Sequence, residues 1–210
     1  MDANQQTRSN PFGMDADCEN CPALCTTRER VVHGYGDVGA DFLFVGETPG
    51  EGADRTGVPF TGDERGERLQ DILGRLGLND SLPSADDPEL KNAFVTYLAR
   101  CRHPERPPTD EEVGTCEPYL NAEIRMINPE ILVPVGERAL AEIATEYTTT
   151  PADEFELPDA HATTIRGRGF EIVPMADPKT LTDDQKAAFL DHFEGLMGRD
   201  YRQTKGRRGR

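Results

Sequence analysis

The sequence contains no tryptophan, only four lysines among its 23 basic residues, and no long run of apolar residues. A helix that crosses a bilayer needs about 20 consecutive apolar residues, so the sequence predicts no membrane span and no membrane partner. The first ten residues are polar and lack the apolar stretch of a secretory signal peptide. We therefore expect a soluble, cytoplasmic protein.

The charge is strongly one-sided, with 39 acidic residues and a formal net charge of −16. A DNA-binding protein generally presents a basic face to the phosphates. Abundant Asp and Glu with scarce Lys is, however, typical of proteins from salt-loving archaea. Because the Debye length falls to roughly 3 Å in 1 M salt, such acidity repels DNA only weakly. The composition therefore predicts a halophilic protein and does not exclude a nucleic-acid partner.

Short apolar runs alternate with helical periodicity along the chain. Strands are expected at 41–46, 93–100, 131–135 and 170–175, and helices at 65–77, 111–128, 137–145 and 183–197. The helix over 111–128 is expected in two pieces, since proline at Pro118 removes a helical hydrogen bond. Strands separated by helices predict an α/β fold, a three-layer αβα sandwich with a mostly parallel four-stranded central sheet.

The length of 210 residues is that of one domain, and we expect a monomer. The domain is expected over residues 14–200. Residues 1–13 are expected to be a disordered polar start, and 201–210 a basic flexible tail. The segment 148–168 is rich in Pro, Gly and Asp, which predicts an irregular surface excursion.

Five cysteines offer a set of thiols. Cys18 and Cys21 form one pair, Cys101 and Cys116 a second, and Cys25 follows the first pair. Disulfides are rare in a reducing cytoplasm, so the pairs indicate a metal centre more than scattered buried thiols. Four thiolates suit either zinc or an iron–sulfur cluster, and the spacing alone does not choose between them.

A glycine-rich loop, 46–62, follows the first predicted strand and holds five glycines and two prolines. Ligands of parallel sheets bind beyond the strand carboxyl ends, where this loop lies. Its carboxylates Glu47, Glu51 and Asp54 could position a water, and Phe60 offers a flat face for stacking a base. The loop lacks the GxxxxGK[ST] pattern of a phosphate loop. A merely long acidic loop is the simpler alternative.

Four motifs follow one another along the chain. They are the cysteine pair at 18–21, Phe44-Val45-Gly46-Glu47 with Gly57-x-Pro59-Phe60-x-Gly62, Val95-Thr96 running into Arg100-Cys101-Arg102-x-Pro104, and Asn128-Pro129-x-Ile131-Leu132-Val133 with Gly136. In this combination and order, from about residue 18 to about residue 195, they resemble the family 4 uracil-DNA glycosylases. The resemblance implies a base-excision repair enzyme that hydrolyses the N-glycosidic bond of uracil, or of another damaged base, in single- or double-stranded DNA.

The resemblance also implies a cofactor and roles for single residues. It implies a [4Fe–4S] cluster, with zinc as the alternative, on Cys18, Cys21, Cys101 and Cys116. Glu47 is expected to position the attacking water, and Asp177 falls at the second catalytic position. Base contacts are expected from Gly46, Pro49, Phe60 and Tyr97, and DNA contacts from Arg102 and Lys179.

Two residues depart from the family pattern. Tyr97 replaces the asparagine that reads the uracil edge, and Asp177 replaces the histidine that donates to the leaving base. An ionised carboxylate only accepts hydrogen bonds, and losing one such donor costs about 10²–10³ in rate. His103, which is better placed than His161, could supply the missing donor only if a loop folds it in, and a plain surface histidine is expected at both positions. The alternative function is a non-catalytic DNA-binding paralogue that keeps the fold and cluster.

Overall fold

The computed structural model describes residues 5–199 and 201 and is built around one β-sheet. Within these residues the sheet has six strands in the order β1-β3-β2-β4-β6-β5. Their bounds are β1 Tyr35–Gly36, β2 Phe42–Gly46, β3 Ala93–Tyr97, β4 Ile131–Val135, β5 Ile165–Arg166 and β6 Glu171–Ile172. The central strands β3, β2, β4 and β6 are parallel, so their carboxyl ends share one edge, where ligands bind in such sheets.

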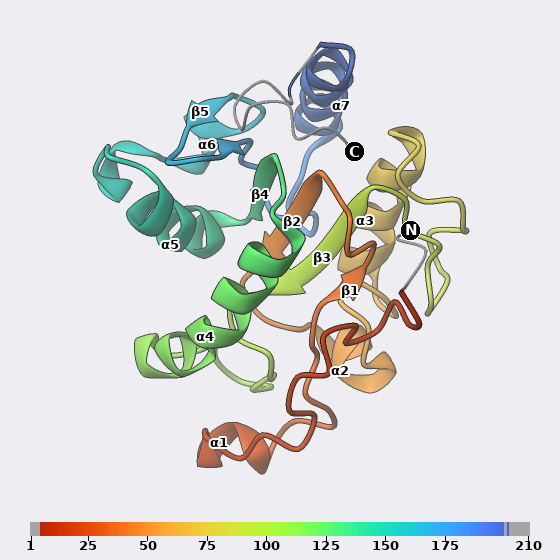
Figure 1. Cartoon of the computed structure of the whole chain (residues 1–210), viewed down its shortest axis with the longest axis vertical. Helices are drawn as coiled ribbons and strands as arrows, with labels where there is room; N and C mark the ends of the chain where they lie inside the picture. The colour runs from red at the N-terminus through yellow and green to blue at the C-terminus, as the bar shows by residue number, and fades with distance from the viewer. Residues whose placement is uncertain (1–4, 200, 202–210) are drawn as a thin grey trace.

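Helices cover both faces of this sheet (Figure 1). Their bounds are α1 Pro22–Cys25, α2 Glu51–Thr56, α3 Glu64–Arg75, α4 Asp110–Ile127, α5 Glu137–Tyr147, α6 Leu157–Ala160 and α7 Asp183–Met197, with a 3-10 turn at Ala152–Glu154. Side chains alternate along a strand. Phe42 and Phe44 of β2 accordingly pack in the core cluster with α3 and α7, while Leu43 and Val45 pack in the cluster with α4 and α5. The expected three-layer αβα sandwich is confirmed.

The sheet has six strands where four were expected. The extra strands β1 and β5 each have two residues and pair antiparallel at the two edges, and such short strands carry no readable period. Helix α4 differs too, because it runs through Pro118 as one helix. A capping box at Thr109 and a buried stripe that includes Val113 and Ile124 hold it together, which outweighs the single hydrogen bond that proline removes.

The chain start is also more ordered than expected. Ser9 pairs antiparallel with Tyr35, and the N–H of Asn10 donates to the carbonyl of Gly34 at 3.0 Å. The described part of the 1–13 segment therefore extends the sheet edge. Of the predicted 201–210 tail only Tyr201 is described, with its ring 5.3 Å from that of Phe42; the rest lies outside the described residues.

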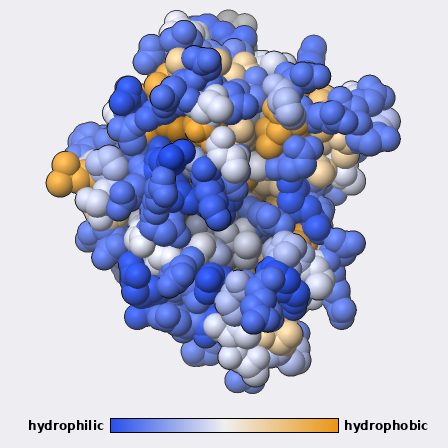
Figure 2. Space-filling view, turned by 180° about the vertical axis from the view of Figure 1, so that it is seen from behind, coloured by the Kyte–Doolittle hydropathy of each residue, from blue (hydrophilic) through white to orange (hydrophobic). Residues whose placement is uncertain are grey.

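Figure 2 shows a surface covered mainly by hydrophilic residues, with separate hydrophobic patches. The most exposed large apolar side chain of the described residues is Leu82, at 76%. Among the helices formed by residues 5–199, none combines the length and apolar character needed to cross a membrane.

Candidate base-binding site and cysteine centre

The carboxyl ends of three central strands meet at Gly46. In the register of the sheet, Gly46 of β2 lies opposite Tyr97 of β3 and Val135 of β4. A Cβ atom at Gly46 would lie 2.6 Å from Cζ of Phe60 and 2.9 Å from Cδ1 of Tyr97. Only glycine therefore lets both aromatic rings pack onto the backbone here.

Phe60 and Tyr97 form a buried aromatic pair above Gly46. Their ring centroids are 4.7 Å apart at an interplanar angle of 37°, and each residue is 1% exposed. The Phe60 N–H donates to the Tyr97 hydroxyl oxygen at 2.9 Å. Burial raises the pKa of the Tyr97 hydroxyl, so it stays protonated. The position expected to read a base edge is thus occupied by a phenol ring that contacts the expected stacking residue.

Phe60 is held in an uncommon conformation. Its φ is +55°, a left-handed value that bulky residues rarely adopt. Its carbonyl accepts a hydrogen bond from Gln70 Nε2 at 3.2 Å, and a Cβ at Gly66 would approach its backbone to 2.5 Å. The ring also lies 5.6 Å from the Arg65 guanidinium carbon, within cation–π range. In this structure Phe60 therefore faces protein groups and not the open pocket expected from the sequence.

Asp177 is paired with a cation that sequence reasoning did not identify. Arg65 Nε donates to Oδ1 at 3.1 Å and its Nη2 lies 3.0 Å from Oδ2. Arg65 Nη1 also donates to the Thr48 carbonyl at 3.3 Å. Arg65 thus ties the strand-end loop to the segment after β6 and offsets the carboxylate charge. The sequence feature that could have identified Arg65 is its position in the first turn of the helix that follows the glycine-rich loop.

Arg100 and Arg102, which follow β3, have contacts other than Asp177. The Arg100 guanidinium donates to Glu123 at 2.7 Å in the core. Arg102 lies 3.8 Å from Glu51. Lys179 is exposed, and only its backbone N–H reaches Asp177 Oδ1, at 2.9 Å.

Of the two histidines considered as donors, His161 is the one beside the second catalytic segment. Its Nδ1 accepts from the Ala176 N–H at 3.0 Å, and its Nε2 lies 2.8 Å from the Gln185 carbonyl. Both ring nitrogens are therefore engaged in structural contacts. His103 Nδ1 accepts from the Glu105 N–H in its own loop. In this structure His161 thus contacts the segment that contains Asp177, whereas His103 bonds within its own loop.

Three further residues of the glycine-rich loop, Glu47, Pro49 and Asp54, differ in burial and in their contacts. Glu47 is half-buried at the strand end, and its carbonyl accepts from Ala99, while Pro49 is buried. Asp54 is 2% exposed and accepts from the backbone N–H of Glu29 at 3.0 Å. Asp54 therefore anchors the segment after α1.

The four paired cysteines come from three segments that the fold brings together. Cys18 and Cys21 lie just before α1, Cys101 follows β3, and Cys116 lies on α4. Burial, then Cys116, Glu112 and Cys18, raises the pKa of the Cys21 thiol. Burial also raises the pKa of the Cys101 thiol, to about 11, with Cys116 and Cys18 adding to it. The four thiols are therefore close enough to influence one another electrostatically.

Arg28 and Tyr119 donate hydrogen bonds in this cysteine centre. Arg28 Nη1 donates to Cys101 Sγ at 3.2 Å, and Nη2 donates to the Cys18 carbonyl at 2.5 Å. A hydrogen bond with Cys18 raises the pKa of Tyr119 to about 12. Cys25 Sγ lies 3.8 Å from the Cys18 carbonyl. Neither Arg28 nor Tyr119 was identified from the sequence.

The donor set of this centre consists of thiols, which suit either zinc or an iron–sulfur cluster. Throughout residues 5–199 and 201, no three His, Cys, Asp or Glu side chains are placed to hold one metal ion. Zinc needs four sulfurs at about 2.3 Å from one point, whereas each thiolate of a [4Fe–4S] cluster binds a different iron, which leaves the sulfurs further apart. Thiols with hydrogen-bond donors beside them supply the donor chemistry that either group requires.

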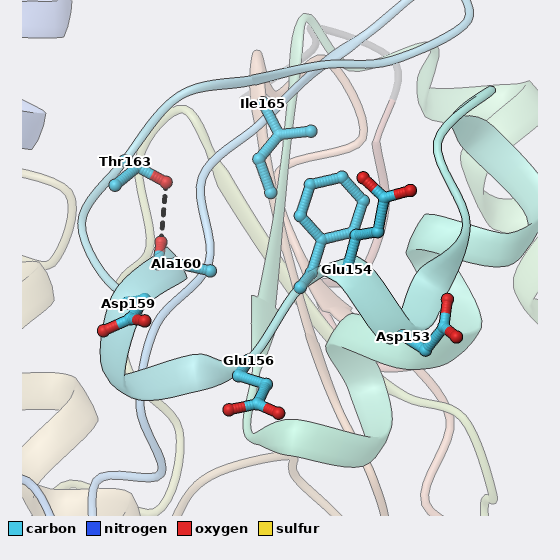
Figure 3. Close-up of a pocket in the computed structure, with 8 residues that line it drawn as sticks. Asp153, Glu154, Glu156, Asp159, Ala160, Thr163 and Ile165 are labelled. Atoms are coloured by element: carbon cyan, nitrogen blue, oxygen red, sulfur yellow. Dashed lines mark hydrogen bonds between the residues drawn. The ribbon is translucent and has the colours of Figure 1, made fainter.

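A separate surface pocket is acidic (Figure 3). It lies around the 3-10 turn and α6, and its lining includes Asp153, Glu154, Glu156 and Asp159. The carboxylates stand around its rim, and Thr163 donates to the Ala160 carbonyl at 2.7 Å. Its lining shares no residue with the strand-end loop at Gly46.

An αβα sheet with a glycine-rich strand-end loop and a neighbouring cysteine centre defines the class of protein. Residues 33–197 match the model of the uracil DNA glycosylase superfamily. The chain belongs to this superfamily.

Curated relatives are of two types. A type-4 uracil-DNA glycosylase from Thermotoga maritima is 36% identical over 59% of each chain. A type-5 uracil-DNA glycosylase from Thermus thermophilus is 37% identical over 61% of this chain and 66% of the relative. A type-4 uracil-DNA glycosylase from Archaeoglobus fulgidus is 32% identical over 74% of this chain and 68% of the relative. The chain thus spans about three fifths to two thirds of the length of these relatives.

Proposed function

We propose that the chain is a DNA base-excision glycosylase that hydrolyses the N-glycosidic bond of uracil in DNA. The observation that carries this proposal is the strand-end loop, in which Glu47 directly follows Gly46, the residue against which Phe60 and Tyr97 pack. Glu47 positions the water that attacks the sugar carbon as the base leaves, and Arg65 keeps the Asp177 charge from opposing the departing base anion. Pro49 shapes the loop, and Arg102 and Lys179 contact the DNA backbone.

The proposed cofactor is a [4Fe–4S] cluster on Cys18, Cys21, Cys101 and Cys116. A cluster bound there ties the segment around α1 to the Arg102 loop and to α4, so its contribution is structural. Arg28 holds Cys101 and Cys18 together through its two hydrogen bonds. We propose a monomer located in the cytoplasm.

The test is an excision assay on purified holoprotein in concentrated potassium chloride, chosen because the composition is acid-rich. Single- and double-stranded DNA carries uracil, hypoxanthine or no lesion. Glu47→Ala is expected to lower uracil excision by at least about 10²-fold, the range for loss of a positioned base. Glu64→Ala, which removes an exposed carboxylate on α3, is the matched control and leaves the rate unchanged. Equal rates for Glu47→Ala and wild type would exclude this role.

A second candidate is a DNA-binding protein without turnover. The observation that favours it is Tyr97, whose ring fills the place expected to read the base. Retained DNA binding without excision of any lesion, even after the Tyr97 and Asp177 positions are returned to the family residues, would establish this second function.

A further inference from the structure

We infer that Tyr97 is an internal gate of the base pocket: its phenol ring occupies the place of an extruded base, and a base binds only when the ring leaves. This inference rests on the proposed function, because it concerns how the same site admits its substrate. It adds, to the loss of the edge-reading asparagine at this position, a direct competition between the Tyr97 side chain and a base.

The contacts of Tyr97 are those that a carbonyl-bearing base would make. An extruded base binds by stacking on an aromatic face and by hydrogen bonds to its edge. The Tyr97 ring packs 4.7 Å from the Phe60 ring, and its oxygen accepts the Phe60 N–H at 2.9 Å. A uracil carbonyl oxygen also accepts, so the base and the phenol compete for one ring and one donor.

A base cannot stack on Phe60 while Tyr97 is in place, because both rings are only 1% exposed. Gly46 backs the pair so closely that a single added Cβ would meet both rings. Arg65 lies near the Phe60 ring on account of its ion pair with Asp177. Because the interior is close-packed, a base has to displace the phenol.

The backbone of Tyr97 is fixed, so its side chain is the moving part. Tyr97 lies at the end of β3, and the next two N–H groups, of Leu98 and Ala99, donate to the carbonyls of Gly46 and Glu47 at 2.8 and 2.9 Å. Opening therefore needs rotation of the side chain with a shift of the Phe60 segment. Phe60 has an uncommon φ of +55°. The hydrogen bond from the Phe60 N–H to the Tyr97 hydroxyl helps to hold this conformation, and it is lost when the Tyr97 side chain rotates away.

The test compares binding of two DNA duplexes of one sequence in high potassium chloride. One carries uracil on a 2′-fluorinated sugar that resists hydrolysis, and the other carries a tetrahydrofuran abasic analogue. Wild type is expected to bind the abasic duplex at least as tightly as the uracil duplex. Tyr97→Ala and Tyr97→Asn are expected to shift the ratio toward uracil by about 10-fold or more. Tyr97→Phe, which loses one hydrogen bond, is expected to shift it by about 2–10-fold.

Tyr35 supplies the matched control, because it is also a buried tyrosine and its hydroxyl donates to the Pro88 carbonyl at 2.9 Å. Tyr35→Phe is expected to leave the binding ratio unchanged. Should Tyr97→Ala fail to fold, the Phe and Asn variants decide the outcome. If the binding ratio shifts across the Tyr97 variants but no variant excises uracil, the proposed glycosylase activity is refuted and the gate is supported. An unchanged ratio across the Tyr97 variants, or wild-type uracil excision as fast as that of Tyr97→Phe, overturns the gate.

Discussion

Arg65 and Asp177 form a two-point ion pair, 3.1 Å from Nε to Oδ1 and 3.0 Å from Nη2 to Oδ2, across 112 positions of sequence. Their side chains are 17% and 35% exposed, so the pair is partly shielded from water. We expect a double-mutant cycle with Arg65→Gln and Asp177→Asn to give a coupling of about 1 kcal/mol in the free energy of unfolding. The exposed pair Arg68–Glu64 on α3 is the control and should stay below about 0.5 kcal/mol. Equal coupling for both pairs would contradict the shielding.

Restoring the two departures from the family pattern is expected to raise excision. Wild-type uracil excision should be weak or absent, and Tyr97→Asn with Asp177→His should raise it at least about tenfold, because the histidine adds a donor toward the leaving base. Single-turnover excision at saturating protein measures the effect. Adding Glu47→Ala to the double variant should abolish the gain. A folded, iron-loaded double variant that excises uracil no faster than an active wild type would show that these two positions do not limit excision.

Protein purified without oxygen is expected to be brown and to contain iron and sulfide. Serine at any one of Cys18, Cys21, Cys101 or Cys116 should reduce the iron content and the visible absorption, because each thiol is a proposed ligand. Cys25→Ser is the matched control and should keep both. A colourless protein with stoichiometric zinc would refute the cluster.

The buried pair Arg100–Glu123 is expected to dominate the stability of the β3–α4 contact. Glu123 accepts from Arg100, from Thr96 Oγ1 at 2.7 Å and from the Gly34 N–H at 3.0 Å. Glu123→Ala leaves a buried guanidinium unpaired, so it should lower the free energy of unfolding by about 3–5 kcal/mol. Glu117→Ala, on the exposed side of the same helix, should change it by less than about 0.5 kcal/mol. Denaturant unfolding at one salt concentration compares the two variants.

Glu112 is expected to make the free energy of unfolding depend on pH in the acid range. A hydrogen bond from Arg106, with further hydrogen bonds at Thr109, lowers its pKa from 4.5 to about 2. Since the folded pKa is depressed, the stabilisation is complete above pH 4.5 and is lost as the pH falls toward 2. The unfolding free energy of wild type minus that of Glu112→Gln should therefore shrink over this window. Glu111→Gln, an exposed neighbour, should show no such trend.

The local elements of this protein follow from short-range patterns. Leu69, Ile72 and Leu73 recur at helical spacing, and all three are buried on α3. The apolar run at Ile131 forms β4 with the expected bounds. Neighbouring residues suffice for this, because a period of 3.6 or 2 decides which side chains share a face.

The long-range contacts of the site were decided only by tertiary packing. The sequence marked Glu47, Phe60 and Tyr97 as site residues, but the Tyr97 hydroxyl meets the Phe60 N–H across 37 positions, and Arg28 meets Cys101 across 73. Such pairings depend on the order of strands in the sheet and on the helices that cover it. A motif records which residues follow one another, whereas the identity of a side chain's partner is set by the close packing of distant segments. The sequence alone therefore determined the layers and the site loop, and the folded chain decided that the Tyr97 ring packs on Phe60 and that Arg65 pairs with Asp177.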